Sequence, residues 1–560
     1  MTSRLEQIRN HIAKIPFVRQ IYHFEQRESY IFGKVQITFD GLDVPLDFDV
    51  EIGPQYPLKS YDAESINFVN KELVQYNHVM ERGNICIHTS HATDIEAKLS
   101  IDFNSLKYWI EKYYINKDSD TNYEHIIVNE KPINGVFYSY TFTDCDEEFN
   151  KGEYGVVNLS KLNIGLYKEK EQRIDNFFVQ EFVKIGGTKK GQQWGNVYTA
   201  KKHIHAGFYY FIETSPVNHN RFIFKNWNEL ADYLPISFLN YLHKFEDAHK
   251  TKNKGNVVPL FLGYKTVGDE IHWQVAHMIL GEFPLEGVPE KIDGVKTGRW
   301  YSELADEEIT WGLSRNASYK YFFGRGRFSD QLTQKKILII GVGAIGSMLA
   351  TTLARCGCQF IDFADYDIKE PENVCRSEYM FSNGITNKTS ELKNILSDIS
   401  PFVNIRPMNN NYFERVIKSF HEDDEAKKMV ADRLANYDLI FDCSTDNDLM
   451  FVLNSLELTS EVINLSITNH AQEFVCAFYP NIYRFVNNQF SNVLKNNTTD
   501  LHNPTGCWSP TFKASYNDIN VLIQLALKRI NNLFHNGKAK NNFVIREDDI
   551  NEGNFKIIEF

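Results

Sequence analysis

The sequence is poor in cysteine, with eight among its 560 residues. No Cys-x-x-Cys pair is present, and Cys356 and Cys358 stand too close together for the usual zinc-knuckle spacing. A disulfide framework is also disfavoured, because such frameworks are dense in cysteine and typical of small secreted domains. Each cysteine is therefore expected to be either a small buried side chain or a nucleophile.

Long apolar runs and an excess of positive charge are lacking as well. No segment reaches the roughly 18 uninterrupted apolar residues of a membrane span, so no membrane partner is expected. The N-terminus lacks the apolar core of a signal peptide and instead has Leu5, Ile8 and Ile12 on one helical face, which favours a cytoplasmic location. The formal net charge of -13 disfavours non-specific nucleic-acid binding, because phosphate would be repelled.

What is present divides the chain into three units. Residues 1–115 alternate apolar and polar residues at 30–39 and 46–52 and end in a helical stripe, which predicts an α+β domain. Residues 124–300 predict a second α+β domain of unclear role. Residues 310–560 alternate strand and helix, which predicts a doubly wound, mainly parallel α/β sheet of the Rossmann type.

The middle and last units carry further local patterns. In the middle unit we expect strands at 135–142 and 206–212 and a helix within 227–242. In the last unit we expect strands at 337–340, 360–364, 403–407, 439–443 and 462–465, and a closing helix at 519–530.

A glycine-rich turn follows the first expected strand of the last unit. Gly341, Gly343 and Gly346 have the Gly-x-Gly-x-x-Gly spacing and stand directly before a helical pattern. The glycines allow a tight turn and the close approach of a phosphate, and the helix N-terminus offers unpaired N–H groups. Asp365 ends the next strand, where a carboxylate can accept hydrogen bonds from ribose hydroxyls. Taken alone, these four residues suit a nicotinamide cofactor as well as ATP.

The polar residues that follow favour ATP. Asn373, Arg376 and Lys388 place an amide and two cations behind the ribose carboxylate. Cations clustered near phosphates suit a triphosphate that is attacked at its α-phosphorus, whereas hydride transfer does not need them. Asp446 follows another buried strand at the open edge of the sheet, where a carboxylate is placed to hold Mg²⁺.

Attack of a carboxylate on the α-phosphorus of ATP would make an acyl-adenylate, and Cys507 is the best candidate in the last unit for a cysteine that captures it. A thiolate captures an acyl-adenylate as a thioester and keeps the acyl group activated. Cys507 lies among Gly, Pro and Trp shortly before an amphipathic helix, whose positive end favours a thiolate. Cys375, inside the phosphate-contact segment, is its rival, whereas Cys443 and Cys476 lie in apolar strand runs and are expected to be core residues.

The segment 315–480 resembles the adenylation (ThiF/E1-like) domain of ubiquitin-activating E1 enzymes and of their bacterial relatives that activate sulfur-carrier proteins. Those domains share the glycine loop, an Asp-x-Asp, an Asn-x-x-Arg, a downstream Lys and a Thr-Asp-Asn at comparable spacing. The resemblance implies that Asp365 holds ribose, that Asn373, Arg376 and Lys388 contact phosphates, and that Asp446 holds magnesium.

The same resemblance implies a two-fold homodimer. Arg315 resembles the arginine that such domains lend across the dimer interface into the partner's site. Arg325 and Arg327 compete with it for this role.

Residues 1–115 resemble a ubiquitin-conjugating E2 (UBC) domain, in their strands, Tyr56-Pro57, Gly83-Asn-Ile-Cys86 and Trp109 on a helix. In that family the cysteine of Gly-x-Ile-Cys accepts the thioester, so Cys86 is the expected acceptor, and core packing is its alternative role. A His-Pro-Asn triplet normally precedes this cysteine, and its Asn steadies the oxyanion. The corresponding residues here are Asn77-His78-Val79, so either Asn77 or His78 is expected to donate that contact.

The order of the units resembles the bacterial E1–E2 fusion proteins of type II CBASS antiphage systems. This resemblance implies a ligase that uses ATP and Mg²⁺ to adenylate the C-terminal carboxylate of a partner protein. Cys507 and then Cys86 would carry the acyl group to a target lysine. In that family the partner is a cGAS-like nucleotidyltransferase, whose conjugation primes antiphage signalling. The alternatives are a separate ubiquitin-like or sulfur-carrier protein as the partner, or a catalytically silent nucleotide-binding scaffold.

Overall fold

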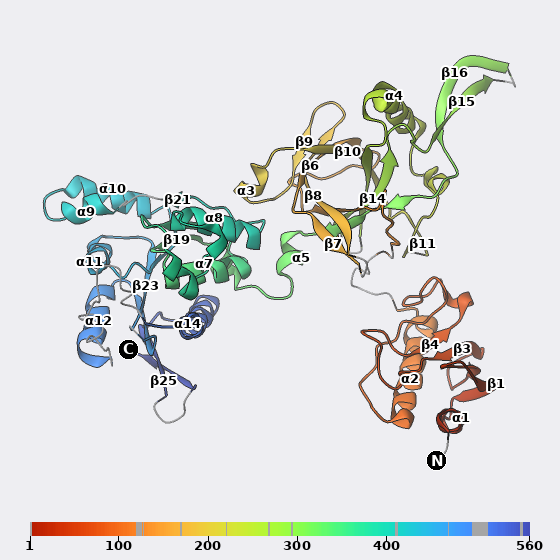
Figure 1. The fold of residues 1–560 in the computed structure, drawn as a ribbon, viewed down its shortest axis with the longest axis horizontal. Helices are drawn as coiled ribbons and strands as arrows, with labels where there is room; N and C mark the ends of the chain where they lie inside the picture. The colour runs from red at the N-terminus through yellow and green to blue at the C-terminus, as the bar shows by residue number, and fades with distance from the viewer. Residues whose placement is uncertain are drawn as a thin grey trace.

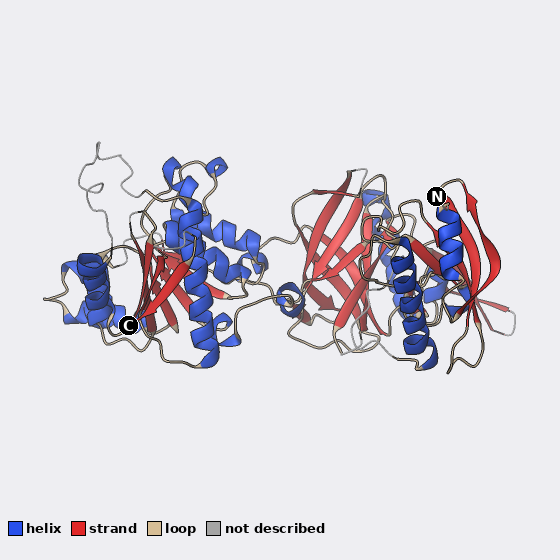
Figure 2. Ribbon diagram, turned by 90° about the horizontal axis from the view of Figure 1, so that it is seen from below, coloured by secondary structure: helices blue, strands red, loops and turns tan. Residues whose placement is uncertain are grey.

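The chain folds into three units built on separate sheets. The computed structural model describes residues 3–118, 126, 128–168, 171–219, 221–266, 269–292, 295–408, 413–468, 470–494, 513–548 and 553–560. The middle unit contacts both of the others, which lie apart from one another (Figures 1 and 2). Within these ranges, no helix is both long enough and apolar enough to cross a membrane.

The N-terminal unit is an antiparallel meander with helices before and after it. Its elements are α1 (Arg4–Ile12), β1 (Val18–Arg27), β2 (Tyr30–Ile37), β3 (Leu46–Ile52), β4 (Ile66–Val69), η1 (Lys71–Leu73), α2 (Ile95–Trp109) and η2 (Ile110–Ile115). The strands expected at 30–39 and 46–52 are confirmed as β2 and β3. The sequence pattern missed β1, because a sheet-edge strand with mostly exposed side chains shows little alternation.

The middle unit is built on a ten-stranded sheet. The path β17-β14-β13-β10-β6-β8-β5-β18 is extended by β7 and β9, which pair with β8. Its strands are β5 (Phe137–Phe142), β6 (Tyr154–Lys161), β7 (Gly165–Tyr167), β8 (Gln172–Lys184), β9 (Lys189–Gly191), β10 (His205–Glu213), β13 (Val257–Lys265), β14 (Ile271–Ile279), β17 (Thr310–Trp311) and β18 (Leu313–Asn316). Two hairpins, β11 (Val217–Asn218) with β12 (Phe222–Ile223) and β15 (Leu285–Ile292) with β16 (Val295–Leu304), and α3 (Asn196–Thr199), η3 (Trp227–Leu230) and α4 (Ile236–Asn253) complete it.

Two expectations for this region are corrected. The helix expected within 227–242 is a short 3-10 turn followed by α4, because Pro235 stands directly before Ile236 and has no N–H to continue an earlier helix. The strands β17 and β18 pair with the middle sheet, so residues 310–316 belong to it and the third unit begins after Asn316, not at residue 310.

The third unit is the doubly wound α/β sheet that the sequence predicts. The strand order is β21-β20-β19-β22-β23-β24-β25-β26, with the first five strands parallel and the last three antiparallel. These strands are β19 (Lys336–Ile340), β20 (Phe360–Ala364), β21 (Pro407–Met408), β22 (Leu439–Asp442), β23 (Glu461–Ile467), β24 (Glu473–Phe478), β25 (Phe543–Glu547) and β26 (Phe555–Glu559). The helices and turns are α5 (Tyr319–Phe323), α6 (Asp330–Thr333), α7 (Ala344–Arg355), η4 (Pro371–Arg376), η5 (Phe381–Asn383), α8 (Lys388–Ile399), α9 (Glu414–Lys418), α10 (Asp424–Leu434), α11 (Asn447–Ser455), α12 (Ile482–Asn488), η6 (Gln489–Val493) and α14 (Tyr516–Asn536).

The strand expected at 403–407 is corrected to β21 at Pro407–Met408. Before it, Asn404 forms only an isolated parallel bridge to Phe360, and the backbone of Ile405 bonds to the middle unit instead of to a strand. The Asn196 side chain donates to the carbonyl of Ile405 at 2.9 Å and accepts the Ile405 N–H at 3.2 Å, as a neighbouring strand would. The Gly195 N–H donates to the carbonyl of Pro401 at 2.7 Å. A Cβ on Gly195 would lie 2.4 Å from the carbonyl oxygen of Val403, so this approach requires glycine.

The opposite side of the middle unit contacts the N-terminal unit. The Arg221 guanidinium donates to the carbonyl of Val74 at 2.7 Å, and Lys225 forms an ion pair with Glu81. Both partners in the N-terminal unit lie in the loop that leads to Cys86.

Candidate functional site

The glycine loop joins β19 to α7, and each glycine has its own reason to be there. Gly341 has a φ of +80°, and a Cβ on it would lie 2.6 Å from the Cα of Ser444. A Cβ on Gly346 would lie 2.0 Å from the carbonyl oxygen of Gly341, so this glycine lets α7 pack against the loop. Gly343 precedes α7, and a Cβ there would meet open space. The N-terminus of α7 is therefore accessible to an anion.

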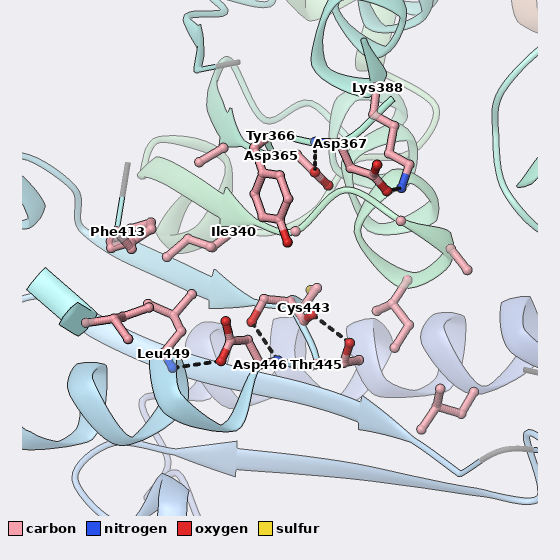
Figure 3. Close-up of a pocket in the computed structure, with 18 of the residues that line it drawn as sticks. Ile340, Asp365, Tyr366, Asp367, Lys388, Phe413, Cys443, Thr445, Asp446 and Leu449 are labelled. Atoms are coloured by element: carbon pink, nitrogen blue, oxygen red, sulfur yellow. Dashed lines mark hydrogen bonds and ion pairs between the residues drawn. The ribbon is translucent and has the colours of Figure 1, made fainter. Parts of the chain in front are cut away.

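A cavity of 390 Å³ lies at the carboxyl ends of the parallel strands (Figure 3). The residues predicted from the sequence that line it are Gly341, Gly343, Asp365, Arg376, Lys388 and Asp446. Phe413 and Leu449 lie at one end of the cavity, with the Asp446 carboxylate beside Leu449, and Asp367 and Lys388 lie at the other end (Figure 3). Such a shape suits a ligand with a flat apolar ring and an anionic tail.

Asp365 connects the glycine loop to the end of β20. One carboxylate oxygen accepts the N–H of Val342 at 2.9 Å, and the other accepts the N–H of Asp367 at 2.8 Å. These two bonds fix the carboxylate at the cavity wall. A carboxylate has about four lone-pair sites, so each oxygen can still accept a ribose hydroxyl.

The cation Lys388 begins α8 and forms an ion pair with Asp367. We expect Lys388→Met to weaken ATP binding by about tenfold or more, because a charge-assisted hydrogen bond contributes roughly 1.5–3 kcal/mol and the Asp367 charge would then face the phosphates unpaired. Calorimetric titration with a non-hydrolysable ATP analogue measures this change. Lys393→Met, on the same helix but outside the cavity lining, is the matched control. Equal affinity in the two variants would contradict the assignment of Lys388.

Asp446 is the N-cap of α11 as well as a cavity residue. Its Oδ1 accepts the N–H groups of Asp448 at 2.9 Å and Leu449 at 3.1 Å, which leaves Oδ2 as the oxygen available to a cation. Figure 3 shows Asp446 across the cavity from Asp365. Among the described residues no group of three or more His, Cys, Asp or Glu side chains is placed to hold a metal. One carboxylate nevertheless fits Mg²⁺, because this ion is often held by one or two carboxylates together with phosphates and water.

Asp442, which the sequence analysis does not single out, is linked by hydrogen bonds through Ser444 to the turn that carries Asp446. It is buried, and its carboxylate accepts the Ser444 hydroxyl at 2.7 Å and the Asn464 amide at 2.9 Å. Burial raises the pKa of Asp442, and these hydrogen bonds offset only part of the effect. Ser444 in turn accepts the N–H of Asp446 at 3.2 Å. An aspartate that ends the apolar run at 439–441 was the signal available in the sequence.

Three of the residues predicted for the nucleotide site lie outside the cavity lining. Gly346 lies beneath the loop, as its packing requires. Asn373 accepts the N–H of Glu370 at 2.9 Å, so its side chain caps η4. Arg315 is exposed on β18 of the middle sheet, where it donates to the carbonyl of Ser314. Its two competitors, Arg325 and Arg327, are exposed as well, and the lending of an arginine between copies stays a prediction.

The cysteines of the third unit differ in accessibility. Cys507 lies within residues 495–512, outside the described residues, and its role stays a prediction. Its rival Cys375 is exposed on η4, where its thiol donates to the carbonyl of Glu372. Cys443 and Cys476 are buried, as expected for core residues, and burial raises the pKa of both thiols.

Cys86 lies in the loop that follows β4 and is partly exposed. Its N–H donates to the carbonyl of His78 at 2.7 Å, and its Sγ lies 3.9 Å from Nε2 of His88. His78 has a φ of +59°, and its ring packs on Tyr113. The Asn77 amide donates to the carbonyl of Asp118 at 3.3 Å. The role of Asn77 or His78 as an oxyanion donor therefore stays a prediction.

A buried charge cluster lies behind this loop. Lys98 donates to Glu64 at 3.0 Å and to the Thr89 hydroxyl at 2.6 Å, and it forms an ion pair with Asp102. Tyr56 donates to the other oxygen of Asp102 at 2.8 Å. Burial raises the pKa of Glu64, but the hydrogen bonds from Lys59, Lys98 and Thr89 outweigh it and bring the pKa to about 2. The stabilisation by Glu64 is therefore full above its ordinary pKa of about 4.5 and is lost as the pH falls towards 2.

We expect Lys98→Met to lower the free energy of unfolding of the N-terminal unit by about 3 kcal/mol, because two buried carboxylates would lose their cation. The pH below which the free energy of unfolding falls should also be higher in this variant, because the pKa of Glu64 would rise towards its ordinary value. Hydrogen exchange of α2, followed by mass spectrometry between pH 3 and 7, measures both effects. Lys59→Met is the control, since Lys59 pairs with Glu64 from a more exposed position, where water screens the pair, and its loss should cost much less stability than the loss of Lys98. Equal losses in both variants would contradict the role given to the buried lysine.

The third unit is similar in sequence to a known protein family. Residues 313–495 match the model of the ThiF family. The chain is 28% identical over 331 residues to the ATP-dependent ubiquitin transferase-like protein Cap2 of Enterobacter hormaechei subsp. hoffmannii (strain UCI 50), a match that covers 55% of this chain and 53% of that protein. It is also 28% identical over 127 residues to the ubiquitin-like modifier-activating enzyme 5 of Culex quinquefasciatus, which covers 22% of this chain and 32% of that enzyme.

A crystal structure of E. coli MccB with ATP overlaps 41% of this chain and 64% of its own, at 17% identity and a TM-score of 0.28, which does not establish a shared fold. The chain spans about half the length of the Enterobacter protein and a third of the Culex enzyme. The cavity, with its glycine loop and the carboxylates and cations that line it, thus lies in a segment that is similar to the ThiF family.

Proposed function

We propose that this protein is an ATP-dependent ligase that adenylates the C-terminal carboxylate of a partner protein and passes the acyl group through thioesters to an amine. The observation that carries the proposal is the cavity, which brings Asp365, Arg376, Lys388 and Asp446 together at the N-terminus of α7. Its likeness to the ThiF family and to a ubiquitin transferase-like protein supports the same chemistry.

We assign each part of ATP to a region of the cavity as a proposal. We propose that the adenine lies towards Phe413 and Leu449 and that Asp365 accepts the ribose hydroxyls. The phosphates would then lie near the N-terminus of α7, with Arg376 and Lys388 as cations and Mg²⁺ on Asp446.

In this arrangement a carboxylate oxygen of the partner attacks the α-phosphorus. The new O–P bond forms as the bond to pyrophosphate breaks, and the cations neutralise the charge that builds up on the phosphates. Cys507 would displace AMP to form the first thioester, and Cys86 would receive the acyl group from it before a lysine amine does.

For the partner we propose the C-terminal tail of a cGAS-like nucleotidyltransferase, with priming of antiphage signalling as the outcome, or else a ubiquitin-like protein. We also propose a homodimer in which Arg315 serves the cavity of the other copy. Arg315 is exposed on the middle sheet and outside the cavity of its own chain, so its side chain is accessible to another copy.

Pyrophosphate exchange tests the proposal. Peptides that correspond to the C-terminal tails of proteins encoded beside this gene are supplied with ATP, Mg²⁺ and labelled pyrophosphate. The cognate tail should bring label into ATP, and the same peptide with a C-terminal amide should not, because it has no carboxylate to adenylate. If ATP binds but no tail supports exchange, the cavity belongs to a nucleotide-binding scaffold and the ligase is ruled out.

A further inference from the structure

The loop that carries Cys86 places a second reactive side chain beside the thiol. Ile85 and Ile87 are buried, whereas Cys86 is partly exposed and His88 is exposed. In an extended segment, side chains two residues apart lie on the same face. Cys86 and His88 therefore point outwards together, and the Sγ and Nε2 atoms are 3.9 Å apart, within reach of a weak sulfur hydrogen bond.

Buried groups fix the backbone on both sides of this pair. Ahead of it, the Cys86 N–H donates to the carbonyl of His78 at 2.7 Å. Behind it, the Thr89 N–H donates to Glu64 at 3.0 Å, and the Thr89 hydroxyl accepts a hydrogen bond from buried Lys98 at 2.6 Å. The thiol and the imidazole are thus side by side because the fold holds their backbone in place.

The charged groups around Thr89 pair with one another. Lys98 forms ion pairs with Glu64, at 3.0 Å, and with Asp102, and Lys59 lies 2.8 Å from Glu64. Two ammonium groups and two carboxylates compensate each other there. None of these ion pairs involves His88, and the contact that the structure gives its Nε2 is the one to Sγ of Cys86.

We propose that His88 is the acid–base partner of the Cys86 thiol and a catalytic residue of acyl transfer, an inference that rests on the proposed function of Cys86. Nε2 of His88 takes the proton from Sγ of Cys86, and the sulfur then attacks the carbonyl carbon of the incoming thioester. A C–S bond to Cys86 forms as the C–S bond to the donor cysteine breaks. The imidazolium returns its proton to the departing sulfur, so the exchange is balanced in atoms and charge.

Alkylation of the full chain tests the pair without any partner protein. Iodoacetamide is applied between pH 5.5 and 9.5, and modification of the Cys86 peptide is followed by mass spectrometry. At pH 7 the native protein should react about threefold to tenfold faster than His88→Gln, because a neighbouring imidazolium raises the thiolate fraction although it lowers the nucleophilicity of each thiolate. His91→Gln, a change at a nearby exposed histidine, should react like the native protein. Equal rates and equal pH midpoints in the native protein and His88→Gln would overturn the proposal.

Thioester transfer separates this inference from the proposed function. With a cognate tail, His88→Gln should load Cys86 about tenfold more slowly than the native protein at pH 7 and regain most of the rate near pH 9, where the thiol ionises unaided. Equal loading at pH 7 would overturn the acid–base role of His88. If the native protein never loads Cys86 while the alkylation difference persists, the pair stands as an activated thiol and the proposed role of Cys86 fails.

Discussion

Asp446→Asn is expected to lower the rate of ATP–pyrophosphate exchange by about a hundredfold or more, because loss of roughly 3 kcal/mol of transition-state stabilisation has an effect of this size. The proposed magnesium contact depends on the negative charge of this carboxylate. The cap of α11 depends only on its Oδ1 atom, which accepts N–H groups from Asp448 and Leu449. Asparagine keeps an acceptor oxygen at that position, so the substitution removes the charge and preserves the cap.

Two further variants complete this test. Asp446→Ala should show the same loss of exchange and, in addition, about 1 kcal/mol of lost stability, because alanine cannot cap the helix. Asp448→Asn changes a neighbouring exposed carboxylate outside the cavity lining and should leave exchange near the native rate. Exchange is measured with saturating ATP over a range of Mg²⁺ concentrations, and stability by thermal unfolding. If Asp446→Asn exchanged within about threefold of the native rate, a role for Asp446 in holding magnesium would be excluded.

The parts of the site that could be predicted are those that depend on residues close together in the sequence. A Cβ on Gly341 or on Gly346 would lie under 3 Å from the backbone of the Ser444 turn or of the loop itself, so the tight turn that their spacing predicts depends on glycine at both positions. Asp365 follows the end of β20 and Asp446 follows the end of β22, the two parallel strands that flank β19. Their carboxyl ends meet at one edge of the sheet and bring the two side chains to one cavity.

The parts that could not be predicted depend on contacts between distant segments or on competition for one side chain. The two hydrogen bonds between Asn196 and the backbone of Ile405 join segments about two hundred residues apart, and hydrophobic periodicity does not predict such contacts. The pairing of β18 with β5, which places Arg315 on the middle sheet, joins segments about 170 residues apart and has no local signal either. Asn373 matches the motif, yet its side chain accepts the Glu370 N–H, as asparagine often does near a helix start.

The two proposed thioesters predict a difference between Cys507→Ala and Cys86→Ala. Both variants should retain pyrophosphate exchange, because adenylation precedes thiol attack. Cys86→Ala should accumulate a reductant-sensitive adduct on Cys507 and form no amide-linked product, whereas Cys507→Ala should form neither. Alanine has no nucleophilic sulfur and cannot form a thioester. We therefore expect product formation to fall by about a thousandfold or more in each variant. Intact-mass spectrometry with and without dithiothreitol, followed by peptide mapping, distinguishes these species.

The arrangement of the units gives this order its physical reason. The nucleotide cavity belongs to the third unit and Cys86 to the first, and the two units lie apart on the middle unit (Figures 1 and 2). An acyl-adenylate hydrolyses readily in water, so a thiol close to the cavity must capture it before a distant thiol can receive it. Cys375→Ser is the decisive control, because Cys375 is exposed on η4 beside Arg376. If the first adduct disappears in Cys375→Ser and persists in Cys507→Ala, Cys375 is the capturing thiol; if Cys86→Ala makes product at the native rate, transfer through the N-terminal unit is excluded.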